Sequence, residues 1–432
     1  MMTNSRRLLY IAFTFPPLAG PGPRHNLSTV RGLVAAGFLP TVITAPEAFQ
    51  DPSKPKKWPD EYLRTRIPKD VTIIPFTRSF KGHDALNSIL SPLGFTPVPY
   101  SFRRGRVALY DVCRRALDAT HHEIIYSVNG FGLEHPAALQ LKRRTGLPWI
   151  AEFRDPWIYN LTEWYGIRDG SWQWWCRRQY NKTKQILSEI VNNADLIVVE
   201  SPMHGELLTK DFELDPQKVA PLGIGYESDY LSDIREGFVR FPTRPVIGFI
   251  GQVWYGYQHA IRNLTEALGV LEREGHQFTL VSVGDPDNTF YRFAREAKLT
   301  NFVPIRNVDY LSALSIMSEL DFGIVATCEK CLPTINSKLW EYLALNQSIL
   351  GIVPKAGSMA AIIDEGNCGY VLPYDSESMV YSLRKALDDH KRGKTRRANV
   401  DFVRRYSRKI MVARLIERLD ELLPAQTTPP LP

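Results

Sequence analysis

The sequence lacks several features that would assign a protein to a particular class. It has no run of the ~18 apolar residues that a membrane-spanning helix needs, and it has no low-complexity segment. Its formal net charge is +7, but no long Lys/Arg tract concentrates that charge. The positive balance fits an acidic partner, whereas the absence of such a tract argues against nucleic acid.

Cysteine is also scarce, with five residues in 432. Their scattered positions fit a reducing compartment. Cys328 and Cys331 form a lone CxxC pair without a second pair of ligands at suitable spacing, which argues against a zinc site and against redox use. The first apolar run follows MMTNSRR, lacks a small-residue cleavage site and is predicted to be a strand. We therefore expect a cytoplasmic protein, with attachment to the inner face of the membrane left open.

A chain of 432 residues, 44% hydrophobic and 23% charged, predicts two or three globular domains. Leu8–Thr14 is strand-like, residues 15–25 form a Pro/Gly loop, and residues 26–36 have helical periodicity. A second strand at 40–44 completes a βαβ unit, which predicts a parallel sheet. The alternation stops in the polar segment 227–244 and restarts at Val246. We therefore expect an N-terminal domain at 1–228 and a second domain at 243–398, with a last periodic segment at 401–423.

The stretch from Thr334 to Ser358 carries the strongest chemical signal. Thr334, Asn336 and Ser337 can cap a helix that contains Lys338 and Glu341 in its first turns, and an apolar strand follows. A helix N-terminus suits an anion, and Lys338 adds a full positive charge. Glu341 can accept hydrogen bonds from hydroxyls, so phosphate plus ribose is the natural ligand. A capped surface helix is the structural alternative.

The N-terminal half offers a second group of candidates: Gly20, Gly22, Arg24, His25, His135 and the pair Arg154-Asp155. Gly20-Pro-Gly22 lacks the third glycine of a dinucleotide fingerprint and places prolines where N–H donors are needed, so NAD is disfavoured. The glycines are predicted to let the backbone approach a ligand. Arg154-Asp155 follows a predicted inner strand, where α/β sheets place their chemistry. The alternative is a structural ion pair that caps the strand.

The segment from Asn160 to Lys184 mixes tryptophans with cations. Its part from Trp172 to Lys184 is a candidate contact for an anionic membrane surface. The alternative, a helix packed on the core with a basic outer face, is favoured slightly over the membrane. Single-stranded nucleic acid also binds such mixtures, but nothing else in the sequence supports it.

Five motifs in order carry a resemblance to a known family. They are FPPLAGPGPRHNL after the first strand, LPWIAEFRDPW, ADLIVVES, IGFIGQVW at the start of the second domain, and INSKLWEYLALNQSILGI. With this order and spacing the chain resembles the retaining glycosyltransferases of family 4, of the bacterial surface-polysaccharide or glycoconjugate type. The resemblance implies the GT-B fold: two Rossmann-like domains that face each other across a cleft, with a C-terminal helix that crosses back to the first domain.

By this resemblance, the second domain holds a nucleotide-diphosphate sugar as co-substrate, with uridine favoured as the base and no cofactor or metal. Lys338 and the N–H groups around Ser337 and Leu339, next to Asn336, would bind the diphosphate. Glu341 would bind the ribose. The base would lie at the backbone of Asn307 and Val308, and the phosphate would approach Gly251 and Gln252. Asp155 would serve as base or orienting carboxylate for the acceptor hydroxyl, with Arg154 near the donor phosphate or sugar, and a glycan or lipid-linked precursor as acceptor.

The chain departs from the family pattern at three places. Pro333 stands where the first glutamate of the acidic pair belongs, so the usual contact to the donor sugar is lost; Glu329 is a candidate substitute. Gln252 replaces a basic residue, and Ile224-Gly225-Tyr226-Glu227 replaces the NG(V/Y)D signature. Two alternatives therefore stay open: a nucleotide-sugar epimerase of the same fold, and a degenerate, membrane-associated protein without catalytic activity.

Overall fold

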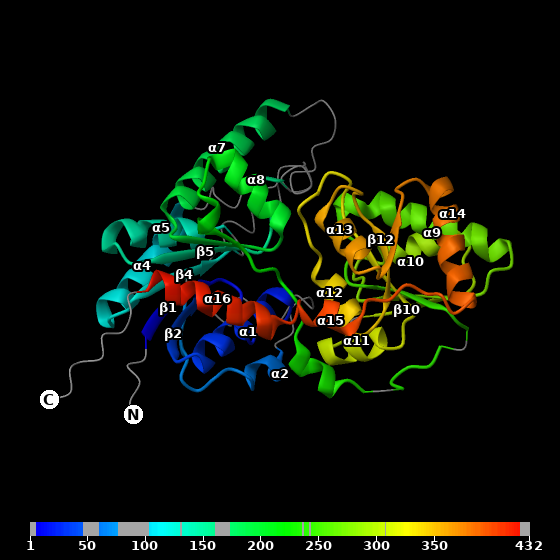
Figure 1. The fold of residues 1–432 in the computed structure, drawn as a ribbon, viewed down its shortest axis with the longest axis horizontal. Coiled ribbons are helices and arrows are strands. Elements are labelled where there is room, and N and C mark those ends of the chain that lie inside the picture. The colour runs from blue at the N-terminus through cyan, green and yellow to red at the C-terminus, as the bar shows by residue number, and fades with distance from the viewer. Residues whose placement is uncertain are drawn as a thin grey trace. The chain divides into compact units, whose positions relative to one another are not determined.

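The computed structural model describes residues 6–45, 60–76, 103–129, 132–159, 173–235, 237–241, 243–306 and 308–423. The chain forms two compact units (Figure 1). Unit 1 takes its described residues from Met1–Ile158, Ile167–Gly223 and Lys409–Pro432, and unit 2 from Tyr159–Gly166 and Ile224–Arg408. The segment 227–244, predicted as the linker, belongs to unit 2, where Tyr230 is buried and packs edge-on against Tyr310.

Unit 1 is built on a seven-stranded parallel sheet in the order β3-β2-β1-β4-β5-β6-β7. Its strands are β1 (Arg6–Ala12), β2 (Phe38–Thr44), β3 (Thr72–Pro75), β4 (Ile124–Val128), β5 (Trp149–Phe153), β6 (Leu196–Val199) and β7 (Val219–Pro221). The strand order reverses beside β1, which pairs with both β2 and β4. In open parallel sheets this switch point is where ligands bind, beyond the carboxyl ends of the strands.

The helices of unit 1 are α1 (Pro21–Ala35), α2 (Glu61–Arg64), α4 (Arg103–Ala119), α5 (Glu134–Thr145), α7 (Gln173–Asn193), α8 (Pro202–Phe212) and α16 (Arg408–Leu422). Helix α1 begins five residues before the predicted start, because Pro21 occupies a first-turn position that needs no N–H donor. Gly22, Arg24 and His25 therefore lie in a helix, not in the predicted loop.

Unit 2 has a six-stranded parallel sheet in the order β10-β9-β8-β11-β12-β13. The strands are β8 (Val246–Ile250), β9 (Thr279–Val283), β10 (Phe302–Ile305), β11 (Phe322–Ala326), β12 (Ser348–Ile352) and β13 (Gly369–Leu372). Its helices are α9 (Gln258–Arg273), α10 (Thr289–Glu296), α11 (Tyr310–Met317), α12 (Ser337–Ala344), α13 (Ser358–Glu365), α14 (Ser376–Lys391) and α15 (Val400–Arg404). The strands β8, β9, β11 and β12 are buried along their whole length, as both-face burial of a parallel sheet requires.

The periodic segment predicted at 401–423 forms two helices in the structure. Helix α15 ends at Arg404, and α16 begins at Arg408. Between them the chain forms a bridge from Ser407 to Tyr226 within unit 2. The following helix α16 belongs almost entirely to unit 1 and lies alongside α1 (Figure 1). Val412 of α16 lies directly over Gly32 of α1.

Helix α12 lies close against β11 because Gly323 has no side chain. A Cβ atom at Gly323 would lie 2.3 Å from Cγ of Tyr342, whose ring is fully buried. The Tyr342 hydroxyl also donates to the carbonyl of Gly248 in β8, at 3.2 Å. This contact fixes α12, and with it Lys338 and Glu341, on the sheet.

We expect Gly323→Ala to destabilise the protein by about 1–3 kcal/mol, the usual cost of overpacking a core. Urea denaturation would measure the change. Gly351→Ala is the matched control, because the nearest atom there is the terminal methyl of Ile363, which can rotate away. Equal stability of the two variants would show that Gly323 does not fix α12.

Candidate functional site

Gly251 lies at the carboxyl edge of the unit 2 sheet, directly after β8. Gly251 has φ of +125°, a conformation that favours glycine, and no atom of the described residues lies within 4 Å of the position that a Cβ would take. Its N–H donates to the carbonyl of Val283 at 2.8 Å. The next residue, Gln252, donates from Nε2 to Asp287 at 2.8 Å. The strand end is therefore held in place while its outer side stays open.

Helix α12 starts at the same edge, after β11. The Asn336 side chain caps it by accepting from the Lys338 N–H at 2.9 Å. The Leu339 N–H donates to the Asn336 carbonyl at 3.0 Å, so it is not available for the predicted diphosphate contact. The donors left at this helix start are the N–H of Ser337 and the ammonium of Lys338.

Lys338, Glu341 and Tyr310 form one cluster. Lys338 Nζ lies 2.5 Å from Oε2 of Glu341, one helical turn on. The Tyr310 hydroxyl donates to the other carboxylate oxygen at 3.1 Å, and Lys338 Nζ lies 5.7 Å from the Tyr310 ring centroid. Glu341 is only 7% exposed. The predicted cation and the predicted hydroxyl-binding carboxylate thus lie side by side, and Tyr310 orients the carboxylate.

Of the two residues predicted to bind the base through their backbone, the structure describes only Val308. Asn307 lies outside the described residues. Val308, between β10 and α11, is 37% exposed. It lies two residues before Tyr310 and therefore at the same edge as the cluster.

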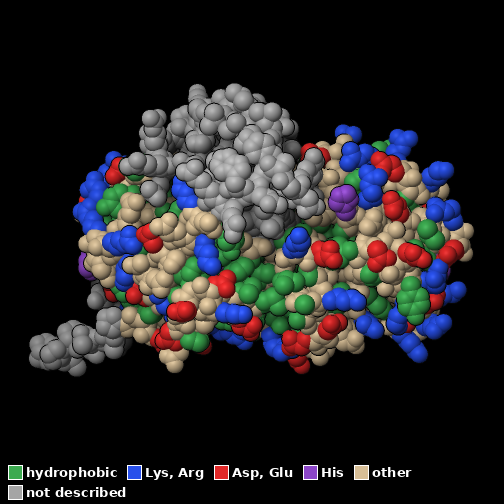
Figure 2. All heavy atoms as spheres, turned by 90° about the horizontal axis from the view of Figure 1, so that it is seen from above, with side chains coloured by type: hydrophobic (Ala, Val, Ile, Leu, Met, Phe, Trp, Pro, Cys, Tyr) green, Lys and Arg blue, Asp and Glu red, His purple; other side chains and the backbone are tan. Residues whose placement is uncertain are grey.

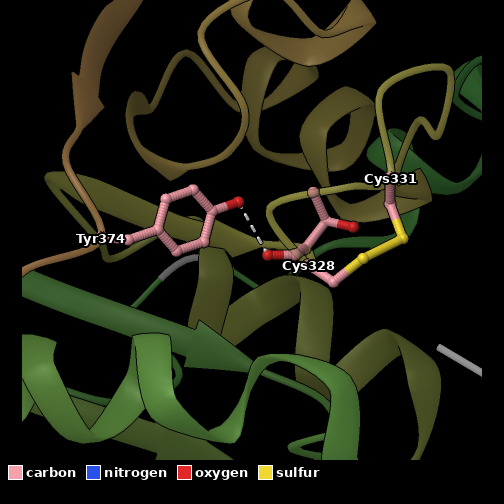
Figure 3. Close-up of a disulfide and its surroundings, with 4 residues drawn as sticks. Cys328, Cys331 and Tyr374 are labelled. Carbon is pink, nitrogen blue, oxygen red and sulfur yellow. Dashed lines mark hydrogen bonds between the residues drawn. A yellow bond between two sulfur atoms is a disulfide. The ribbon is translucent and has the colours of Figure 1, made fainter. Parts of the chain in front are cut away.

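The loop that leads from β11 to α12 is closed by a disulfide between Cys328 and Cys331 (Figure 3). The sequence analysis did not predict that these two cysteines pair with each other. The Cys331 N–H donates to the Cys328 carbonyl at 3.1 Å, so the two residues close a tight turn. The Tyr374 hydroxyl anchors the adjacent Thr327 carbonyl at 3.0 Å.

In unit 1, α1 begins at the carboxyl edge of the sheet beside Arg154. The N-cap Gly20 has φ of +124°. A Cβ at Gly22 would lie 2.6 Å from Nη1 of Arg154 and 2.7 Å from Oγ1 of Thr14. The close approach that Gly22 permits is therefore to these two side chains. Because the guanidinium lies against the positive end of a helix, the two together favour an anion.

Arg154 and Asp155 do not form the ion pair that was the structural alternative. Within the described residues no salt bridge joins them, and the Arg154 N–H donates to Oδ1 of Asn129 at 2.7 Å. Arg154 Nε is buried, and no group in the described part of the chain forms a hydrogen bond with it. The charge of Asp155 acts instead on Glu200 at the end of β6, where it helps to raise the glutamate pKa.

His25 and Arg24 are buried, at 4% and 8% exposure. His25 Nε2 contacts Oε1 of Glu152 in β5, and Tyr126 of β4 donates to Oε2 at 2.7 Å. Burial alone would raise the Glu152 pKa, but His25, Tyr126 and Arg154 together hold that pKa below its usual value. His25 therefore balances a buried carboxylate and does not line an open surface.

His135 does not line an open cleft either, because its side chain is fully buried. Its ring packs against Phe153 and Trp157, and Nδ1 lies 2.8 Å from Oγ of Ser127. Nε2 has no hydrogen-bond partner. Burial lowers the His135 pKa to about 3, so the imidazole is neutral at physiological pH.

The sequence analysis missed three charged or titratable residues at this edge: Glu152, Glu200 and His204. Glu200 is 2% exposed and contacts Nδ1 of His204 at 2.7 Å. Burial, with Asp155 as a smaller cause, raises the Glu200 pKa. An acidic residue in or directly after an apolar strand was the available signal, in WIAEF for Glu152 and in LIVVE for Glu200.

The proposed membrane contact from Trp172 to Lys184 is mostly outside the described side chains. In the described part of this segment, Nζ of Lys184 lies 5.8 Å from the ring centroid of Phe212 in α8. Figure 2 shows Lys and Arg side chains interspersed with Asp and Glu on the face that it draws.

None of the described helices has the length and hydropathy needed to cross a bilayer. Among the described residues no three His, Cys, Asp or Glu side chains gather as metal ligands.

No family model matches the sequence, and no curated protein matches it. Solved structures do match along nearly the whole chain. A glycosyltransferase from Rickettsia africae has a TM-score of 0.67 at 14% identity, over 98% of this chain and 100% of that one. The Anabaena protein HepE in complex with UDP-glucose has a TM-score of 0.62 at 14% identity, over 96% and 99%.

Epimerases share the same architecture. UDP-GlcNAc 2-epimerase from Neisseria meningitidis, bound to UDP-GlcNAc, has a TM-score of 0.57 at 10% identity, over 96% of this chain and 100% of that one. At these identities the likeness concerns the fold alone. Two parallel-sheet α/β units of seven and six strands, matched over their whole length, give this chain the fold of GT-B glycosyltransferases and epimerases.

Proposed function

We propose that this protein is a glycosyltransferase that moves a sugar from a nucleotide-diphosphate sugar to a hydroxyl acceptor, with retention and without a metal ion. One observation carries the proposal: Lys338, Glu341 and the start of α12 lie together at the carboxyl edge of the unit 2 sheet. Each matches one part of a nucleotide donor. A pyrophosphate requires positive charge and N–H donors, and a ribose requires a carboxylate.

The ammonium of Lys338 and the Ser337 N–H would bind the diphosphate. As the bond to the sugar breaks, negative charge grows on the leaving phosphate, and a fixed cation stabilises it. Glu341 would accept hydrogen bonds from the ribose hydroxyls, because each oxygen of an ionised carboxylate can accept more than one hydrogen bond. Gly251 leaves room for a phosphate, Gln252 supplies an amide near it, and Val308 would border the base, with uridine favoured.

Unit 1 would supply the acceptor side of the reaction. Asp155, half-buried after β5, is the proposed base for the acceptor hydroxyl. Arg154 at the start of α1 would contribute positive charge toward the donor phosphate. We propose a glycan or lipid-linked precursor as acceptor, and a cytoplasmic enzyme that works at the inner face of the membrane. The anionic membrane contact through residues 172–184 stays part of this proposal.

An epimerase of the same fold is the second candidate, since solved epimerases share this architecture. It would interconvert the nucleotide sugar without any acceptor. Release of nucleoside diphosphate that depends on an acceptor hydroxyl therefore distinguishes the transferase. A non-catalytic protein would show neither reaction.

The first test is the thermal shift produced by UDP, GDP, dTDP, CDP and NAD. A ligand at 100 times its Kd stabilises the native state by about 2.7 kcal/mol. We expect one nucleoside diphosphate to raise the melting temperature of the wild type but not of Lys338→Ala. Lys391→Ala, exposed at the end of α14, is the matched control and should keep the shift. A shift with NAD alone, or an unchanged shift in Lys338→Ala, would contradict the donor site.

The second test concerns Asp155. We expect Asp155→Asn to lower turnover of the nucleotide sugar about 10²–10⁴-fold, the usual contribution of a positioned general base. Binding of the nucleoside diphosphate should stay unchanged, because Asp155 acts on the acceptor. Steady-state assays and calorimetry measure the two effects separately. Asp70→Asn, an exposed aspartate of unit 1, is the control, and wild-type turnover in Asp155→Asn would remove Asp155 from the mechanism.

A further inference from the structure

The proposed donor site assigns groups to the base, the ribose and the diphosphate, but none to the transferred sugar. These groups follow the order of the strands in the unit 2 sheet. Val308 comes after β10, Gly251 after β8 and Lys338 after β11. The next strand along is β12, which pairs in parallel with β11, so its carboxyl end lies at the same edge. The loop after β12 is therefore the next place along this edge, as the sugar is the next group of the donor.

That loop leads into α13, a helix of eight residues whose first turn lies against the start of α12. The Ser358 N–H donates to the carbonyl of Leu332, in the loop that precedes α12, at 2.8 Å. The N–H of Asn336, the residue that caps α12, contacts the sulfur of Met359 at 3.4 Å. These two contacts place the start of α13 beside the proposed diphosphate site.

No side chain caps the start of α13. Its N-cap residue is Gly357, and its first turn contains no acidic residue. A Cβ at Gly357 would lie 3.0 Å from the Leu332 carbonyl oxygen and 3.1 Å from that of Pro354, so the packing favours a residue without a side chain. At many helix starts a Ser, Thr, Asp or Asn oxygen accepts from the first N–H groups. The first turn of α13 lacks such an acceptor within the described residues.

Three hydrogen-bond donors at this helix start have no acceptor in the described part of the chain. Two are the N–H groups of Met359 and Ala360, residues that are each 1% exposed. The third is the hydroxyl of Ser358, which is buried and has no hydrogen-bond partner, in a residue that is only 6% exposed. Buried polar groups are nearly always hydrogen-bonded, and one left without a partner is destabilising. Three such donors at one place indicate a ligand that accepts.

The charge at this helix start favours an anion. A helix N-terminus carries partial positive charge, and the exposed Lys355, two residues before Gly357, adds a full one. The one acid of the loop before α12 is Glu329, which is exposed, so its side chain can point to solvent. A sugar hydroxyl both donates and accepts, whereas a carboxylate only accepts and carries negative charge. A carboxylate therefore matches every donor at this place.

We propose that the start of α13 is the subsite for the transferred sugar and that it binds a carboxylate on that sugar. The donor is then a nucleoside diphosphate that carries a uronic acid. This inference rests on the proposed function. The Ser358 hydroxyl and the N–H groups of Met359 and Ala360 would donate to the carboxylate, and Lys355 would attract it. The second phosphate of the donor offers the same anionic oxygens, and a comparison with UDP distinguishes the two.

The test compares the affinities for UDP, UDP-glucose and UDP-glucuronate by calorimetry. The two sugars differ only at carbon 6, where glucuronate has a carboxylate in place of a hydroxymethyl group. We expect the wild type to bind UDP-glucuronate about ten-fold more tightly than UDP-glucose. Ser358→Ala should weaken UDP-glucuronate about ten-fold, which corresponds to ~1.4 kcal/mol, and change UDP and UDP-glucose by less than about two-fold. GDP, GDP-mannose and GDP-mannuronate replace this set if the thermal shifts select guanosine.

Ser348→Ala is the matched control. Ser348 is a fully buried serine whose hydroxyl also has no hydrogen-bond partner in the described part of the chain. It is the first residue of β12 and lies at the opposite end of that strand from α13. Because both substitutions remove an unpartnered hydroxyl, neither should lower the melting temperature, and only Ser358→Ala should alter binding. A melting temperature lowered in Ser358→Ala alone would show that the protein itself uses this hydroxyl and would overturn the subsite.

The remaining outcomes separate the inference from the function on which it rests. A wild type that binds UDP, but binds UDP-glucuronate no better than UDP-glucose, would overturn the uronic-acid subsite alone. A preference for UDP-glucuronate that Ser358→Ala keeps would overturn it too. An equal loss for all three ligands would also overturn it, because the start of α13 would then hold the second phosphate. A wild type that binds no nucleotide at all would overturn both the subsite and the proposed function.

Discussion

The parallel pairing of all the described strands is the constraint on which the rest of this structure depends. A parallel sheet is covered by helices on both faces, so its strands are mostly apolar and the polar groups that a ligand can reach lie at the strand ends. In unit 1 this brings Arg154, Asp155 and Glu200 to one edge, after the neighbouring strands β5 and β6. In unit 2 it brings Gly251 and the loop before Lys338 to one edge, after the neighbouring strands β8 and β11. The topology therefore determines where the candidate catalytic and binding groups lie, whichever residues occupy those positions.

Charge inside unit 1 is balanced in two different ways on adjacent strands. Glu152 is held ionised by His25 and Tyr126, whereas burial and the nearby Asp155 raise the pKa of Glu200. An unpaired buried carboxylate would be costly, and each glutamate therefore has a histidine against it. Asp155 is thus close to two buried carboxyl groups, those of Glu152 and Glu200, whose pKa values are shifted in opposite directions.

Local sequence signals predicted much of the fold. The predicted strands at Leu8–Thr14 and 40–44 overlap β1 and β2, because a short apolar run marks a buried parallel strand within a short window. The start of α1 was misplaced because two prolines resemble a loop, although a first helical turn tolerates them. The roles of His25 and His135 were not predictable, because burial is a property of the whole unit. The break between α15 and α16 depends on a bridge to Tyr226, distant in sequence, and the Cys328–Cys331 pairing depends on a turn that spacing alone does not reveal.

The pairing of Lys338 with Glu341 has a consequence for how a nucleotide would bind. Each side chain is partly desolvated, and the attraction between the two charges offsets the hydration that each has lost. A diphosphate brings negative charge toward Lys338, and this charge competes with Glu341 for the ammonium. An ammonium has three donors, so it can serve a phosphate while it still contacts the carboxylate. Tyr310 keeps Glu341 in place during this exchange, because its hydroxyl bonds to the other oxygen. A cation that shares its donors in this way binds the phosphate without leaving an unpaired charge behind, and a phenol and a carboxylate from neighbouring elements are sufficient to arrange it.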